Sequence, residues 1–189
     1  MNVLSLQQLL ACLHNDEPVL FPTDTVPALA IKPSAAAQIW SLKQRPAHKP
    51  LILMGADLLQ LEKALDEAWS PEWLEEAKRV WPGAVTLVLP VPGPLRELLN
   101  PGGDSLGLRV PACPMAQELL LRSGPLATTS VNRSGEAPAL NAEQACQLFP
   151  ELPLLGPVPW PRASGHPSEV RAWSKDGWQV LRPQSLPKP

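Results

Sequence analysis

The chain has 189 residues, of which 44% are hydrophobic, and a formal net charge of −2. This length and apolar content can bury one ordinary core, which excludes an intrinsically disordered protein. The slightly acidic charge argues against a protein that coats nucleic acid regardless of sequence, because such proteins carry net positive charge. The 25 prolines are spread along the chain and predict many rigid turns between short elements.

Apolar periodicity and turn residues divide the chain into short helices and strands. In chain order they predict helix 5–14, strand 19–21, helix 34–43, strand 51–54, helices 57–67 and 71–81, strands 85–89 and 106–110, helix 114–122, strand 126–130, helix 141–149, and strands 170–171 and 178–182. Ser34, Ser70 and Asn141 are expected to act as N-caps, with Pro71 in the first helical position.

These elements alternate irregularly, without a repeat or a convincing linker. The pattern predicts one α/β or α+β domain over residues 1–189, built on a twisted mixed sheet with flanking helices. Residues from about 183 to 189 are expected to form a ragged tail.

The cysteines and the N-terminal residues indicate the cellular compartment in which the protein is expected. Cys12, Cys113 and Cys146 are far apart and form no CxxC pair, which indicates neither a disulfide framework nor a zinc site. We interpret them as small side chains that fill the core. The N-terminal residues carry no basic segment and no long apolar run, so we expect no secretion signal and no membrane span. Together these features predict a cytoplasmic protein.

The first polar segment, PTDTVP at 22–27, directly follows the predicted strand at 19–21. Its two hydroxyls and one carboxylate suit the ammonium or hydroxyl groups of a ligand. The same residues are typical of an Asx or ST turn that caps the next element, and taken alone the segment favours that turn.

The second polar segment, KQRPAHKP at 43–50, gathers three cations and one histidine between a predicted helix and a predicted strand. Cations at a helix C-terminus compensate the helix dipole. Arg and Lys side chains in a loop stiffened by two prolines also suit the binding of a triphosphate. Both interpretations stay open.

Two further polar segments follow predicted strands. DSLGLRVP at 104–111 places Arg109 inside an apolar strand, where a cation is costly without a partner. We expect Arg109 to pair with an acidic side chain or with a ligand carboxylate. ATTSVNRSG at 127–135 is dense in donors and acceptors, which suit phosphate or ribose, or a turn that satisfies its own backbone.

Several common motifs are absent from the sequence. It contains no GxxxxGK[ST] loop, no GxGxxG and no GxSxG elbow. His14, His48 and His166 show no metal-ligand spacing. The residues alone therefore predict an α/β protein with a basic, hydroxyl-rich cleft that binds anions.

Six motifs in a fixed order carry a resemblance to a known family. PTDTV, KQRP…KPLIL, WPGAVTLVLP, SLGLRVP, TTSVNRSG and HPSEVR together resemble the YrdC-like threonylcarbamoyl-adenylate synthases, from about residue 19 to residue 182. The chain is similar to the short, single-domain bacterial form. The resemblance implies a twisted α/β sheet around a concave basic cavity.

The resemblance also implies a reaction. L-threonine, bicarbonate and ATP give threonylcarbamoyl-AMP and pyrophosphate, the nucleotidyltransferase step that supplies threonylcarbamoyladenosine to tRNA. Mg²⁺ is implied with the ATP phosphates, no protein metal ligand is implied, and a tRNA-modification transferase machinery is the implied partner. Catalysis is expected to rest on positioning and charge stabilisation, with no single side chain as acid or base.

The family's site residues carry over by motif. The implied ATP-binding residues are Lys43, Arg45, Lys49, Ser105, Thr128, Ser130, Asn132 and Arg182. The implied threonine-binding residues are Thr25, Arg109 and Ser168. Lys43 and Arg45 form the family's KxR pair and are expected to position the reacting groups.

The chain departs from the family pattern at three places. Pro27 and Ala28 stand where the family has an aromatic residue and a glycine, Met54 replaces a residue that is often polar, and 137–139 lacks a serine. Two rival functions follow: a fold paralogue without synthase activity, and an RNA-binding or ribosome-assembly module that binds RNA weakly through a basic surface.

Overall fold

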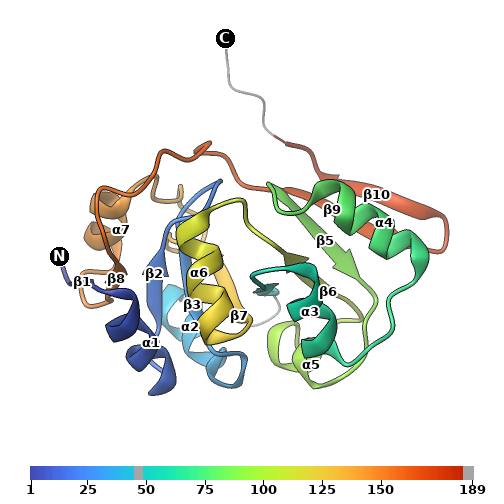
Figure 1. The fold of residues 1–189 in the computed structure, drawn as a ribbon, viewed down its shortest axis with the longest axis horizontal. Helices are drawn as coiled ribbons and strands as arrows, with labels where there is room; N and C mark the ends of the chain where they lie inside the picture. Colours follow the sequence, from blue (N-terminus) through green and yellow to red (C-terminus); the bar gives the residue numbers. More distant parts are fainter. Residues whose placement is uncertain (45–48, 185–189) are drawn as a thin grey trace, which may run out of the picture.

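One mixed sheet of ten strands runs through the part of the protein that the computed structural model describes, residues 1–44 and 49–184 (Figure 1). The strands are β1 (Val3–Leu4), β2 (Val19–Phe21), β3 (Ala28–Ile31), β4 (Ile52–Met54), β5 (Val85–Leu89), β6 (Leu106–Arg109), β7 (Leu126–Ser130), β8 (Leu154–Leu155), β9 (Glu169–Ser174) and β10 (Gly177–Arg182). The helices are α1 (Leu6–His14), α2 (Ala37–Lys43), α3 (Leu58–Leu65), α4 (Pro71–Val80), α5 (Pro94–Leu99), α6 (Pro114–Ser123) and α7 (Ala142–Leu148), with a 3-10 turn η1 (Pro33–Ala35). The predicted α/β class with a mixed sheet is confirmed.

The strand order brings distant parts of the chain together. The sheet runs β1-β8-β2-β3-β7-β4-β6-β5-β9-β10. β6 lies between a parallel neighbour, β4, and an antiparallel neighbour, β5, and β7 lies between β3 and β4. The chain crosses from β8 to β9 over the top of the sheet in Figure 1 and ends in the β9–β10 hairpin. The last residues of this crossing segment, Pro167 and Ser168, line the candidate functional site.

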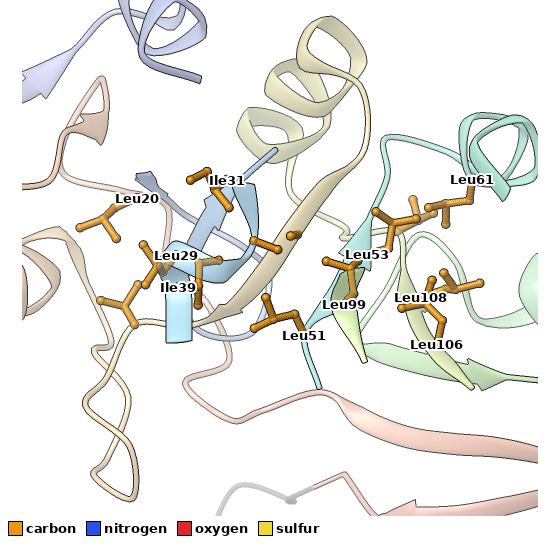
Figure 2. Packing of buried hydrophobic residues seen from close by; sticks show 14 of the residues in the cluster. Leu20, Leu29, Ile31, Ile39, Leu51, Leu53, Leu61, Leu99, Leu106 and Leu108 are labelled. Atoms are coloured by element: carbon orange, nitrogen blue, oxygen red, sulfur yellow. The ribbon is translucent and has the colours of Figure 1, made fainter. Parts of the chain in front are cut away.

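Both faces of the central strands are buried, which explains their continuous apolar runs. Side chains alternate between the faces along a strand. On β2, Val19 and Phe21 pack with Leu9 of α1, whereas Leu20 packs with Ile39 of α2 on the other face. α1 and α6 cover the first face, and the larger cluster on the second face is drawn in Figure 2.

The helix caps test the local predictions. Ser70 accepts a hydrogen bond from the Trp73 backbone, and Asn141 caps α7, so both predicted N-caps are confirmed. The prediction for Ser34 is wrong. It lies in η1, and α2 begins later, after Ala36, with no side-chain cap. The proline at position 33 starts this 3-10 turn, which separates Ser34 from the helix.

Four short elements escaped sequence prediction: β1, β3, β8 and α5. β1 and β8 have two residues each, and strands this short carry no periodicity. β3 reads ALAI, and two of its four residues are alanines, which are depleted in strands. Of the predicted tail, residues 185–189 lie outside the described residues. No helix among the described residues is long and apolar enough to cross a membrane.

Candidate functional site

A cavity of about 300 Å³ opens over the central strands, where the loop between β2 and β3 meets the ends of β6 and β10. Seven of the predicted site residues line it: Thr25, Thr128, Arg109, Ser130, Asn132, Ser168 and Arg182. The other four predicted site residues are not among the described residues that line it. Lys43, Lys49 and Ser105 are not among its described lining residues, and Arg45, like His48, lies outside the described residues. Segments that are far apart in sequence thus converge on one site.

Arg109 is the buried cation of the site, and the partner expected for it is present. It ends β6 with 4% of its surface exposed, and its Nη2 donates to Asp24 Oδ1 over 2.7 Å. Its Nη1 donates to Thr25 Oγ1 over 2.8 Å, and its Nε donates to the Gly83 carbonyl. Burial lowers the pKa of Arg109, and the Asp24 carboxylate opposes that effect.

The two threonines of the PTDT segment have different tasks. The Thr23 hydroxyl accepts from the Thr25 backbone N–H and donates to the Val26 carbonyl over 2.7 Å. This is the self-satisfying ST turn that the sequence favoured. The Thr25 side chain instead accepts from Arg109 and faces the cavity. The turn interpretation is therefore confirmed for Thr23, and the Thr25 hydroxyl, which lies 3.0 Å from that of Thr23, stays a predicted ligand contact.

Lys43 lies behind the cavity wall. It is fully buried at the end of α2, and its ammonium donates to the Ser130 carbonyl and, over 2.8 Å, to Asn132 Oδ1. The Ser130 hydroxyl donates to the same Asn132 oxygen over 2.6 Å. Because Asn132 Nδ2 also donates to two backbone carbonyls, the orientation of this amide is fixed. Lys43 thus holds Ser130 and Asn132 in place along the cavity.

Arg133 anchors the same loop, and the sequence assigned it no role. Its guanidinium stacks over the Phe149 ring at 4.5 Å and donates to the carbonyls of Leu42 and Leu148. These carbonyls lie in the last turns of α2 and α7, where a cation is favourable. Arg133 therefore ties the loop after β7 to two helix ends.

Ser168 is held from two sides. It is buried, and its Oγ lies 2.8 Å from the Thr86 Oγ1 of β5. Arg182 donates from Nε to the Ser168 carbonyl over 2.9 Å and from Nη2 to Ser168 Oγ over 3.5 Å. Although Arg182 is an exposed residue of β10, partial burial of its guanidinium lowers the pKa of Arg182. Sequence reasoning missed Thr86 because a threonine in a β-prone run is ordinary.

The described residues offer no metal-binding cluster. No group of three or more His, Cys, Asp or Glu side chains among them could hold an ion. Glu136 is among the described residues that line the cavity, and Asp24 is paired with Arg109 of the same lining.

Comparison with known proteins places the chain in a family. A model of the Sua5/YciO/YrdC family, described as telomere recombination, matches residues 11–184. The chain belongs to this family. The threonylcarbamoyl-AMP synthase of Serratia proteamaculans (strain 568) is 37% identical over 169 residues, covering 84% of this chain and 86% of that protein. The Yersinia enterocolitica protein of the same name is 35% identical over 176 residues, covering 90% and 92%.

Solved structures share the Sua5/YciO/YrdC fold. P. abyssi Sua5 complexed with L-threonine superposes with a TM-score of 0.88 at 27% identity, over 99% of this chain and 58% of that one. This chain thus spans less than two thirds of Sua5. E. coli YciO superposes with a TM-score of 0.80 at 22% identity, over 97% and 94%, a likeness of fold alone. The resemblance read from the six motifs is confirmed.

Proposed function

We propose that this Sua5/YciO/YrdC protein is an L-threonylcarbamoyladenylate synthase, a nucleotidyltransferase that supplies tRNA modification. The observation that carries the proposal is the convergence of seven motif residues on one cavity. Relatives at 34–37% identity that bear the name threonylcarbamoyl-AMP synthase support the same activity. The Sua5 complex with L-threonine supports threonine as a substrate.

Arg109, Thr25 and Ser168 form the proposed threonine site. A guanidinium carries five N–H groups, and the contacts to Asp24, Thr25 and Gly83 use one on each nitrogen. The described hydrogen bonds leave one N–H on Nη1 and one on Nη2, and a guanidinium binds carboxylate well through such paired N–H groups. The Asp24 carboxylate offsets the desolvation cost of burying the Arg109 guanidinium in the sheet, and it does so without a bound substrate.

Ser130, Asn132, Thr128 and Arg182 form the described part of the proposed ATP site. Lys43 fixes the first two. Lys43 itself, Arg45, Lys49 and Ser105 stay predicted nucleotide contacts. Mg²⁺ would bind with the ATP phosphates and neutralise charge there. The protein's own contribution would be the hydrogen-bond donors that line this cavity.

The proposed reaction depends on positioning the three substrates and needs no covalent intermediate with the protein. The unprotonated amine of threonine attacks the carbon of bicarbonate, and loss of water leaves a carbamate. A carbamate oxygen then attacks the α-phosphorus of ATP, and pyrophosphate leaves with the bond between the α- and β-phosphates broken. Holding three substrates together supplies much of the acceleration. Arg109 and Arg182 add fixed positive charge around the developing anions.

The departures from the family pattern lie on the cavity wall. Pro27, Ala28 and Met54 all line it, and the Pro27 carbonyl accepts from the Val131 backbone. These three residues affect which amino acid can fit in the cavity, so the test compares several amino acids as substrates. The proposed setting is the cytoplasm, where ATP and tRNA occur together, and the proposed partner is the transferase machinery that passes the threonylcarbamoyl group to tRNA.

The test incubates the purified protein with ATP, labelled bicarbonate and single amino acids, and looks for labelled threonylcarbamoyl-AMP and pyrophosphate. We expect product with threonine, and its loss in Lys43→Ala combined with Arg45→Ala. Lys63→Ala, which removes an exposed lysine of α3, is the control and should keep full turnover. No product with any amino acid would favour the fold paralogue, and tight, salt-sensitive RNA binding without turnover would favour the RNA-binding rival.

A further inference from the structure

The WPGAVTLVLP motif contains a buried hydroxyl that the proposed reaction does not use. Thr86 lies in β5 with 1% of its surface exposed, between apolar neighbours, and Leu87 beside it is fully buried. A hydroxyl at such a position is costly unless it is hydrogen-bonded. Valine would fill the same space and suit the strand as well. The Thr86 hydroxyl therefore needs a hydrogen-bond partner.

That partner is Ser168. Among the hydrogen bonds of the described residues, the Thr86 side chain takes part in one, with Ser168 Oγ at 2.8 Å. Either hydroxyl can donate in this bond, but Ser168 lines the cavity and can turn its proton to a ligand, whereas the described residues offer Thr86 no second acceptor. Once a ligand acceptor occupies the cavity, both protons are satisfied only when Thr86 donates to Ser168 and Ser168 donates to the ligand.

The direction of that bond decides what Ser168 can offer a ligand. A serine oxygen accepts two hydrogen bonds and donates one. In the ligand-bound arrangement Thr86 fills one acceptor position of Ser168 Oγ, and Arg182 Nη2 fills the other over 3.5 Å. What remains is the Ser168 proton, and Ser168 lines the cavity. Ser168 consequently faces the ligand as a hydrogen-bond donor.

We propose that Thr86 is a positioning residue that makes Ser168 a fixed hydrogen-bond donor to an anionic oxygen of the bound amino acid. The inference rests on the proposed function, because it takes Ser168 as part of the threonine site. It adds a role for β5, which reaches the substrate only through Ser168. It also selects for a ligand that presents an acceptor oxygen at this point.

Four variants separate the hydroxyl from the packing. Thr86→Val keeps the side-chain shape and removes the hydroxyl. Thr86→Ser and Thr86→Ala both lose the methyl group and differ from each other only in the hydroxyl. Ser168→Ala removes the donor itself. Each protein is checked by thermal unfolding, and the KM for threonine, the KM for ATP and kcat are then measured.

We expect Thr86→Val and Thr86→Ala to raise the KM for threonine about tenfold, the size of one lost hydrogen bond. The KM for ATP should stay within about twofold, and Thr86→Ser should restore threonine affinity. Thr86→Val combined with Ser168→Ala should be no worse than Ser168→Ala alone, because both act through one proton.

The inference is overturned if Thr86→Val binds threonine like the wild type, or if Thr86→Ser is as impaired as Thr86→Ala. Multiplied effects in the double variant would also overturn it. These results differ from failure of the proposed function, in which the wild-type protein itself makes no threonylcarbamoyl-AMP and shows no threonine binding by calorimetry.

Discussion

The ion pair between Asp24 and Arg109 is the sharpest point at which to perturb the site. Asp24→Ala removes the carboxylate 2.7 Å from Nη2, while the guanidinium, with 5% of its side chain exposed, stays inside the sheet. Breaking a buried pair from one side costs about 3–5 kcal/mol. Arg109 keeps two neutral acceptors, Thr25 Oγ1 and the Gly83 carbonyl, so we expect the lower end, about 3 kcal/mol.

Urea unfolding measures this loss, and thermal unfolding should show a fall of roughly 6–12 °C for a chain of this size. Asp24→Asn keeps the shape and one acceptor oxygen, so it should lose less than Asp24→Ala. Arg109→Met and the double variant complete a cycle, in which we expect a coupling energy above about 1.5 kcal/mol. A loss of less than about 0.5 kcal/mol in the unfolding free energy of Asp24→Ala would refute the reasoning, because a buried cation without its carboxylate partner should destabilise the fold by more than that.

Three further predictions concern the supporting structure. Burial alone raises the pKa of Glu76, but hydrogen bonds from Arg79 and Arg171 outweigh it and lower that pKa. Its stabilisation is therefore present above the ordinary glutamate pKa and lost as pH falls through the lowered one, so the Tm gap between wild type and Glu76→Gln should be wide at pH 7 and close in acid. Arg133→Ala should cost about 1–3 kcal/mol in urea unfolding, since it removes the Phe149 stacking and two helix-end contacts; equal stability would contradict this role. A Cβ at Gly83 would lie 2.5 Å from the Val80 carbonyl oxygen, so Gly83→Ala should destabilise by about 1–3 kcal/mol, whereas Gly107→Ala, with ordinary 3.4 Å contacts, should cost less.

Much of the site could be predicted because its residues stand in short motifs. Seven residues named from the sequence line the cavity, and the unusual position of Arg109 in an apolar strand correctly indicated a charged partner. The identity of that partner was out of reach. Asp24 is 85 residues away, and nothing local to either segment indicates that they meet. Lys43 stays a predicted ATP contact, and only the structure shows that its ammonium donates to the Ser130 carbonyl and to Asn132 Oδ1.

The sequence by itself determined the secondary elements that are long enough to show a period, the N-caps at Ser70 and Asn141, and the family. These depend on local residue types and spacing, which act over a few turns or strand residues. Only the tertiary structure decided the strand order that sets β6 between β4 and β5, and with it which polar groups meet. Thr86 and Ser168 are 82 residues apart and share one hydrogen bond. Such a contact depends on the register of the sheet, which brings the two side chains together. It also depends on burial, which excludes the water that would otherwise bind both hydroxyls.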